Sequence, residues 1–173
     1  MADLASVPLS QIHYHFGSKE NLVLALFSAE NARLLERQAA LYAGTDSLAS
    51  QWARACDYLD DDLGSGYVRI LQELIAAGFS RPEIATHVRV TLDGWTAVLS
   101  DAFARHAARG VDFGSLTVPQ LTALASAVFL GAESLLLLGL ESERVPIRQA
   151  LRIIGDIIAA AEARTGAPQV PAK

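Results

Sequence analysis

The sequence contains a single cysteine, Cys56, which excludes an internal disulfide framework. It also lacks a basic character: charged residues make up 19% of the chain and the formal net charge is −5, so no chain-wide positive field draws it to nucleic acid. Its first residues hold neither a basic segment nor a long apolar run, as a cleavable signal would. Alternating runs long enough for paired strands are missing as well. These absences favour an all-α protein of a reducing compartment, and we expect it to be cytoplasmic.

Helical periodicity is what the sequence has instead. Apolar residues recur three and four positions apart in six segments, and glycine, proline or a capping residue stands at most of their ends. The predicted helices span roughly residues 18–42, 48–63, 67–78, 81–109, 118–140 and 146–165. Ser80 with Glu83, and Thr117 with Gln120, have the spacing of capping boxes.

A short stretch near the start has the pattern of a helix, a tight turn and the opening of a longer helix. Pro8 suits a first helical turn, Gly17 can adopt the positive φ that ends a helix, and Ser18 can cap the next one. This stretch resembles the DNA-binding end of the TetR family of bacterial transcriptional repressors. The matching positions are Val7, Ile12, His15, Phe16, Gly17, Ser18, Lys19 and Leu22. Ser6, Pro8 and His13 depart from the family pattern.

The resemblance implies a DNA-binding head joined to a body that binds a small-molecule effector and dimerises. The expected DNA contacts are Pro8, Leu9, Ser10, Gln11, His13, Tyr14, His15 and Lys19. In a full-length form, the two heads of a dimer would enter major grooves about 34–36 Å apart on a DNA operator, and effector binding would release it. The family's first helix and part of its second have no counterpart here, so we expect this chain to bind DNA weakly or not at all.

The resemblance also divides the chain into three parts. Residues 1–43 would form the partial helix-turn-helix head with its connecting helix, residues 44–166 the effector-binding and dimerisation domain, and residues 167–173 a disordered tail. We therefore expect an all-α fold with a helix-turn-helix remnant followed by a TetR-type helical domain.

The segment 121–140 is apolar over about the length that spans a bilayer. Glu133 interrupts it and small residues dilute it, so we interpret it as a helix buried between two subunits and expect no membrane contact. Together with the last helix, residues 146–165, it would form a four-helix bundle with the same helices of a second copy. The sequence therefore predicts a homodimer.

The body contains aromatic and polar residues that suit an effector cavity, although core filling is the alternative for each aromatic residue. The expected ligand contacts are Trp52, Cys56, Tyr67, Phe79, Thr91, Trp95, Phe103 and Glu133, with Tyr58, Gln72, Glu73 and Asp93 as further candidates. Glu133 is the most informative of them. A carboxylate in an apolar helix needs a partner or solvent, or it stays protonated.

No convergent set of titratable residues indicates catalysis. His13 and His15 would point to different faces of a helix, and residues 60–62, all aspartate, are about 100° apart around a helix axis, so we interpret them as a solvated face. Cys56 lies on an apolar stripe and is expected to be a buried, inert thiol. We expect no enzyme activity, no cofactor and no metal. Two functions remain: a TetR-like ligand-responsive repressor, or a stand-alone helical module that binds a small molecule or dimerises without DNA.

Overall fold

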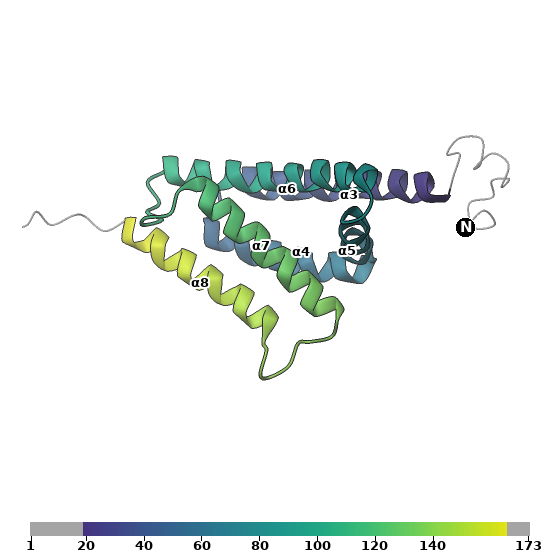
Figure 1. Cartoon of the computed structure of the whole chain (residues 1–173). Helices are drawn as coiled ribbons and strands as arrows, with labels where there is room; N and C mark the ends of the chain where they lie inside the picture. Colours follow the sequence, from purple (N-terminus) through teal and green to yellow (C-terminus); the bar gives the residue numbers. More distant parts are fainter. Residues whose placement is uncertain (1–18, 166–173) are drawn as a thin grey trace, which may run out of the picture.

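The structure of the chain, a computed structural model, describes residues 19–165, and this part is built almost entirely of helices (Figure 1). They are α3 (Lys19–Ala43), α4 (Leu48–Ser65), α5 (Tyr67–Gly78), α6 (Pro82–Ala108), α7 (Val118–Leu137) and α8 (Ile147–Thr165). The only β pairing in the described range is an isolated bridge between Ser142 and Val145. The predicted all-α class is confirmed. The predicted helix-turn-helix remnant and the tail from residue 167 lie outside the described residues.

The two longest helices, α3 and α6, lie side by side along one edge of the molecule (Figure 1). α5 packs on α6 near one end, α7 crosses the body and also contacts α6, and α8 packs on α4. The first turns of α3 project past α5, so this end of the helix extends from the body. The interior between α3, α4, α5, α6 and α7 is therefore enclosed by helices from nearly the whole described chain.

Local capping signals set several helix ends as predicted. The Ser47 side chain accepts a hydrogen bond from the Ser50 N–H at the start of α4. Thr117 and Gln120 form a reciprocal capping box at the start of α7. Gly66 adopts a φ of +86° between α4 and α5, a conformation that residues with a Cβ rarely adopt.

The second predicted capping box, Ser80 with Glu83, does not form. Pro82 is the first residue of α6, which makes Arg81 the N-cap and leaves Ser80 one position outside the helix. Proline is favoured at the first helical position because its missing N–H has no partner to lose there. Ser80 instead donates its hydroxyl to the Ala77 carbonyl, and Glu83 accepts a hydrogen bond from Arg81.

Buried aromatic side chains tie the helices together. Trp52 of α4 donates its indole N–H to the Leu151 carbonyl of α8 at 2.7 Å, and its ring packs against Phe129 of α7. The rings of Phe27 and Tyr67 stack with their centroids 5.2 Å apart, which joins α3 to α5. Such contacts bury large apolar areas while leaving the polar atoms of Trp52 satisfied.

Candidate ligand-binding site

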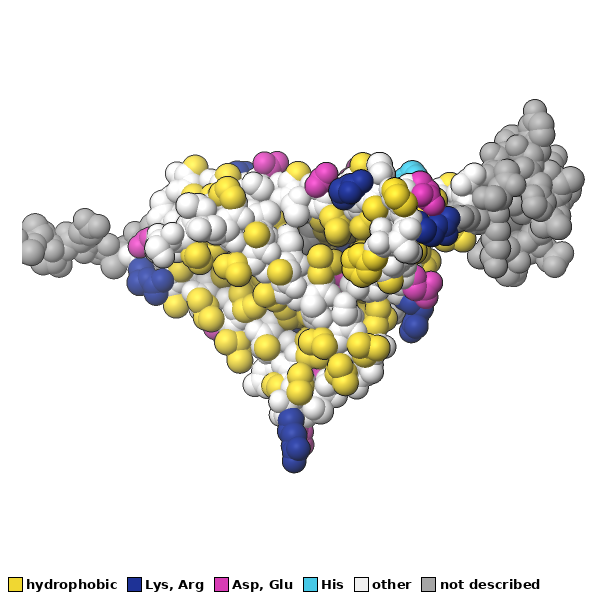
Figure 2. Space-filling model, viewed as in Figure 1, with side chains coloured by type: hydrophobic (Ala, Val, Ile, Leu, Met, Phe, Trp, Pro, Cys, Tyr) yellow, Lys and Arg dark blue, Asp and Glu magenta, His cyan; other side chains and the backbone are white. Residues whose placement is uncertain are grey.

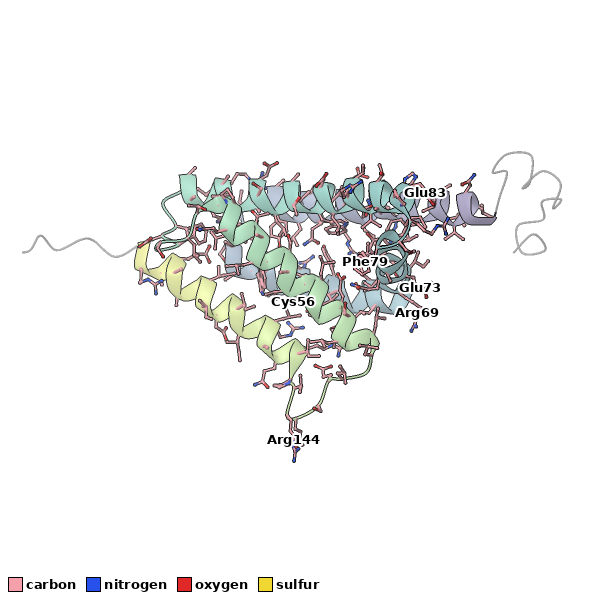
Figure 3. The ribbon with its side chains drawn as sticks, in the orientation of Figure 1. Cys56, Arg69, Glu73, Phe79, Glu83 and Arg144 are labelled. Carbon is pink, nitrogen blue, oxygen red and sulfur yellow. The ribbon has the colours of Figure 1, made fainter. Side chains whose placement is uncertain are left out.

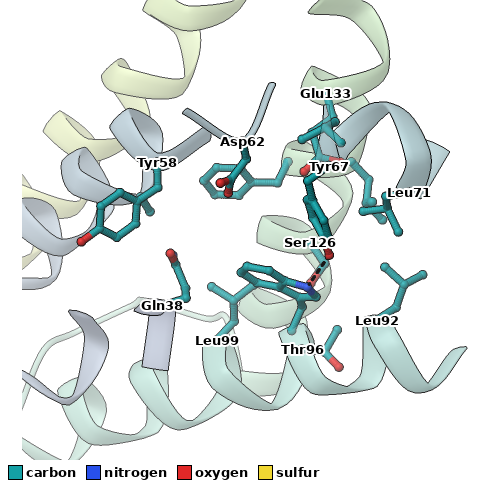
Figure 4. A pocket seen from close by; sticks show the side chains of 15 residues that line it. Gln38, Tyr58, Asp62, Tyr67, Leu71, Leu92, Thr96, Leu99, Ser126 and Glu133 are labelled. Atoms are coloured by element: carbon teal, nitrogen blue, oxygen red, sulfur yellow. Dashed lines mark hydrogen bonds between the residues drawn. The ribbon is translucent and has the colours of Figure 1, made fainter. Parts of the chain in front are cut away.

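A cavity of about 180 Å³ lies inside the ring of helices α3 to α7 (Figure 4). Its apolar wall is formed by Ala55, Val68, Leu71, Leu92, Leu99, Phe129 and Leu130. The lining residues with polar atoms are Gln38, Tyr58, Asp62, Tyr67, Trp95, Thr96, Ser126 and Glu133. A cavity of roughly 150 Å³ is enough to hold a benzene ring, so this one fits a ligand of about that size with a short substituent. A mostly apolar wall with a few polar groups is typical of small-molecule sites.

Three side chains from three helices form a hydrogen-bonded group at the cavity. Tyr67 of α5 donates its hydroxyl to Asn31 Oδ1 of α3 at 2.6 Å, and Trp95 Nε1 of α6 donates to the same oxygen at 2.9 Å. Trp95 Nε1 also lies 3.3 Å from the Tyr67 hydroxyl oxygen (Figure 4, dashed line). Burial raises the pKa of Tyr67, so its hydroxyl remains a donor at neutral pH. Asn31 therefore connects α3 directly to two aromatic walls of the cavity.

Glu133 of α7 brings a carboxylate to the cavity wall. Gln72 of α5 donates its amide N–H to Glu133 Oε2 at 3.1 Å, and Ser134 donates to the Gln72 carbonyl oxygen at 2.9 Å, which fixes the orientation of the amide. Burial raises the pKa of Glu133 to about 7, although the hydrogen bond from Gln72 acts in the opposite direction. No described lysine or arginine forms an ion pair with it. Glu133 therefore exchanges a proton near neutral pH.

Asp62 of α4 is the second carboxylate at the cavity, and it is paired. Both of its oxygens accept hydrogen bonds from the Arg37 guanidinium of α3, at 2.7 and 3.0 Å. Burial raises the pKa of Asp62, and the charge and hydrogen bond of Arg37 oppose that rise. The prediction that residues 60–62 form a solvated face is wrong for Asp62. Asp60 does lie at the surface, where it pairs with Arg148, but Asp62 falls about 200° further around the helix and faces inward.

Three of the eight predicted ligand contacts, Tyr67, Trp95 and Glu133, line the cavity. Trp52 and Cys56 are buried but lie outside its lining, in the packed interior. Trp52 is held by its bond to α8, as described above. Burial raises the pKa of the Cys56 thiol to about 11, in keeping with the predicted inert thiol.

The other three predicted contacts are also placed away from the cavity. Phe79 follows the last residue of α5 and is 86% exposed (Figure 3). Thr91 is buried outside the cavity lining. Phe103 packs edge-on against Phe113, with the ring centroids 5.9 Å apart. Phe103 therefore fills the core, which was the alternative interpretation of its aromatic side chain.

The sequence prediction missed Ser126, although a simple signal marks it. Ser126, Phe129 and Leu130 precede Glu133 by seven, four and three residues, the spacings that share one face of a helix. All of them line the cavity. The Ser126 hydroxyl is buried and has no hydrogen-bond partner in the described chain. Of the further candidates, Tyr58 also lines the cavity and Gln72 acts through Glu133. Glu73 and Asp93 are exposed and lie outside the lining.

The surface formed by α7 and α8 is the second candidate site, and it is apolar. Hydrophobic side chains spread over this face with few charged ones among them (Figure 2). Leu124 is 54% exposed, and Leu138, Ile153 and Ile157 are also exposed. α7 is long and apolar enough to cross a membrane by length and composition alone, and 17% of its apolar window is buried within the chain. By that criterion alone it is weak evidence for a membrane span, since core helices of soluble proteins meet it too.

The predicted DNA contacts from Pro8 to His15 lie outside the described residues, and Lys19 is the first residue of α3. Among the described residues, no three His, Cys, Asp or Glu side chains are grouped so that they could hold a metal ion. Comparisons with protein-family models, curated proteins and solved structures find no match to this chain. The cavity and the exposed apolar face of α7 and α8 are therefore the features of the described residues that bear on function.

Proposed function

We propose that the chain is the body of a TetR-like, ligand-responsive regulator whose full-length form binds DNA: a small-molecule cavity coupled to α3 and a dimer face on α7 and α8. The observation that carries the proposal is the bond network of Asn31. Tyr67 and Trp95 line the cavity, and both donate to this one side chain of α3. α3 is also the helix that follows the segment assigned to DNA contacts.

The hydrogen bonds to Asn31 would couple the cavity to α3. A ligand that moves the Trp95 or Tyr67 ring lengthens a hydrogen bond to Asn31, and α3 must then shift to keep that bond. A bound ligand changes the equilibrium only by its difference in affinity for the two positions of the helix. A shift of α3 alters the orientation of the DNA-contacting segment and weakens operator binding, so the regulator acts as a repressor that its ligand releases.

The dimer face supports the second half of the proposal. Exposed apolar side chains on one face of a soluble domain mark an interaction surface, and α7 and α8 together present the pair of helices that a four-helix bundle requires. Gly131 of α7 has open space where a Cβ would be, so a helix of a second copy can approach closely there. A two-fold arrangement would place two α3 helices at fixed separation.

A thermal-shift screen of small aromatic and aliphatic compounds tests the cavity. We expect hits to raise the melting temperature, since a ligand at a hundred times its dissociation constant adds about 2.7 kcal/mol. Leu92→Trp fills the cavity and should abolish the shifts. Val90→Trp is the matched control, because Val90 lies on the same helix and is 69% exposed. Equal shifts in both variants would refute binding in this cavity. If Leu92→Trp does not fold, Ser126→Leu replaces it.

Sedimentation velocity tests the dimer. Ile157→Glu places a charge on the proposed interface, at a side chain that is 63% exposed in the single chain, and should convert a dimer to a monomer that keeps its helical content. Val90→Glu, away from α7 and α8, should leave the dimer intact. A monomeric parent chain, or a dimer indifferent to Ile157→Glu, would contradict the assignment.

DNA binding separates the two functions that the sequence leaves open. Gel-shift titrations use the chain extended by the in-frame coding sequence upstream of Met1, because the chain itself is expected to bind DNA weakly or not at all. Performed with DNA upstream of the gene, with and without a ligand found in the screen, they measure both affinity and release. Specific binding that the ligand weakens supports the regulator. Ligand binding and dimerisation without specific DNA binding favour the stand-alone module. Hydrogen–deuterium exchange in α3 reports the coupling in either case, and unchanged exchange on ligand binding would refute it.

A further inference from the structure

The charged side chains of the cavity wall are all acidic. Among its described lining residues are two carboxylates, Asp62 and Glu133, and no lysine, arginine or histidine. Asp62 is already neutralised by Arg37, which holds both of its oxygens. The uncompensated charge in the cavity is therefore negative and belongs to Glu133. An anionic ligand would meet this charge without a cation to offset it, at short range and in a low dielectric.

The polar groups of the wall differ in how many further hydrogen bonds they can form. Tyr67 and Trp95 already donate their hydrogen bonds to Asn31, and Thr96 donates to a carbonyl of its own helix. Glu133 accepts one hydrogen bond from Gln72, although a carboxylate can accept about four. Ser126, two helical turns before Glu133 on the same face of α7, has an unused hydroxyl. On α7 the free capacity of the cavity is thus a strip that can accept hydrogen bonds, and Gln38 of α3 and Tyr58 of α4 add an amide and a hydroxyl to the wall.

Aromatic rings of α5, α6 and α7 itself also line the cavity. Trp95 of α6, Tyr67 of α5 and Phe129 of α7 all line the same cavity (Figure 4). The faces of such rings carry partial negative charge and attract a cation within about 6 Å of the centroid. A ligand ammonium beside Glu133 would therefore have the carboxylate, the Ser126 hydroxyl oxygen and ring faces as partners, and its hydrocarbon part would fill the apolar wall.

We propose that the cavity selects a small lipophilic amine in its ammonium form: one aromatic ring or an alkyl group of similar size, with its charge against Glu133. The inference rests on the proposed ligand-binding function of the cavity and names the class of ligand. It follows from the one-sided charge, the unused acceptors on α7 and the volume of about 180 Å³.

The affinity for such a ligand depends on pH through Glu133. The titratable groups that face it are Asp62 of α4 and Tyr67 of α5, with Arg37 of α3 paired to Asp62, while the cavity residues of α6 are not titratable. Burial raises the pKa of Glu133 to about 7 in the free protein, so most of it is protonated a unit below that pH. An ammonium prefers the carboxylate form. Its affinity should therefore rise as the pH increases through 7, by about tenfold between pH 6 and pH 8.

Isothermal titration calorimetry on the full chain tests the proposal with two matched probes, 2-phenylethylamine and 2-phenylethanol. Both have the same hydrocarbon part, and the amine stays charged below about pH 9, as lysine does. We expect the amine to bind at least about tenfold more tightly than the alcohol at pH 8, as one charge-assisted hydrogen bond allows. Glu133→Gln should remove this preference and the pH dependence, while leaving the alcohol's affinity unchanged. Glu73→Gln, on the outer side of α5, should change neither (Figure 3).

The outcomes separate this inference from the function on which it rests. Alcohol binding that equals or exceeds amine binding, or an amine preference that survives Glu133→Gln, overturns the ligand class but leaves a ligand cavity in place. No binding of either probe, together with no hit that Leu92→Trp abolishes in the thermal-shift screen, overturns the cavity's function and the inference with it. Circular dichroism of each variant shows that a lost preference does not come from lost structure.

Discussion

Replacing Glu133 with glutamine should stabilise the protein at alkaline pH and change its stability little at acidic pH. In the folded chain, burial raises the pKa of this carboxyl from its ordinary value of 4.5 to about 7. A group with a raised folded pKa binds more protons in the folded state than in the unfolded state between those two values. The folded state therefore loses stability as the pH rises from 4.5 through 7. A glutamine cannot ionise, so the variant escapes that loss.

The size of the effect follows from the shift in pKa. Each tenfold change in a dissociation constant corresponds to about 1.4 kcal/mol, so ionising Glu133 in place destabilises the fold by about 3 kcal/mol above its folded pKa. The penalty should be roughly 1 kcal/mol near pH 5.5 and close to zero below pH 4.5. Gln72 can donate to the glutamine carbonyl as it does to Glu133 Oε2, so the variant keeps the main local contact.

Urea denaturation followed by circular dichroism, at half-unit steps from pH 4.5 to pH 8.5, measures the free energy of unfolding of the parent and the variant. The informative quantity is the difference between the two proteins, because other titrating groups contribute equally to both. This difference should grow by about 3 kcal/mol from the acid to the alkaline end. Glu73→Gln, at an exposed position of α5, serves as the control and should give a flat difference. A flat difference for Glu133→Gln would show that this carboxyl is solvated and would refute the reasoning.

Three further substitutions test the packing of α4 and α8 by the same assay. Glu162→Gln should destabilise by about 1 kcal/mol, because the Glu162 carboxylate of α8 accepts hydrogen bonds from two backbone N–H groups that open α4. Gly155→Ala should destabilise by about 1 kcal/mol or more, since its new Cβ would lie 3.3 Å from the Trp52 ring. Gly64→Ala, in a helical position with no atom within 4 Å, should instead stabilise by roughly 0.5 kcal/mol, and equal effects of the two alanines would contradict the assigned packing.

The sequence predicted helix positions well because the signals for them are local. Ser47 and Thr117 each cap a helix through atoms three residues away, and Gly66 ends α4 through its own backbone conformation. Where two local signals compete, the pattern alone does not decide. At the start of α6 the proline at position 82 fixed the first turn, and Ser80 lost the capping position that its spacing to Glu83 had suggested.

The cavity was harder to predict because its walls come from five helices. Trp52 and Trp95 both lie on apolar helical stripes, yet one bonds to α8 in the packed interior and the other bonds to α3 at the cavity. Periodicity gives the buried face of a helix but not the neighbour that this face meets. Glu133 was identifiable from sequence because an acidic residue in an apolar helix is a local conflict, which needs no knowledge of the partner helix. Asp62 was not, since its partner Arg37 lies 25 residues away.

Two polar residues, Asn31 beside the cavity and Glu133 in its wall, have opposite energetic roles, and this difference suits a sensor. Asn31 accepts hydrogen bonds from Tyr67 and Trp95 and holds α3 in one position, so this part of the cavity wall has a defined structure. Glu133, in contrast, is half-buried with a single donor, and the raised pKa of its carboxyl means that ionisation destabilises the fold. A sequence selected for stability alone would place an apolar residue or glutamine there, and natural proteins keep such conflicts mainly at functional sites. A ligand cation would relieve the conflict at Glu133 while its ring presses on Trp95. The free energy released at α7 is thus available to disturb the bonds that position α3.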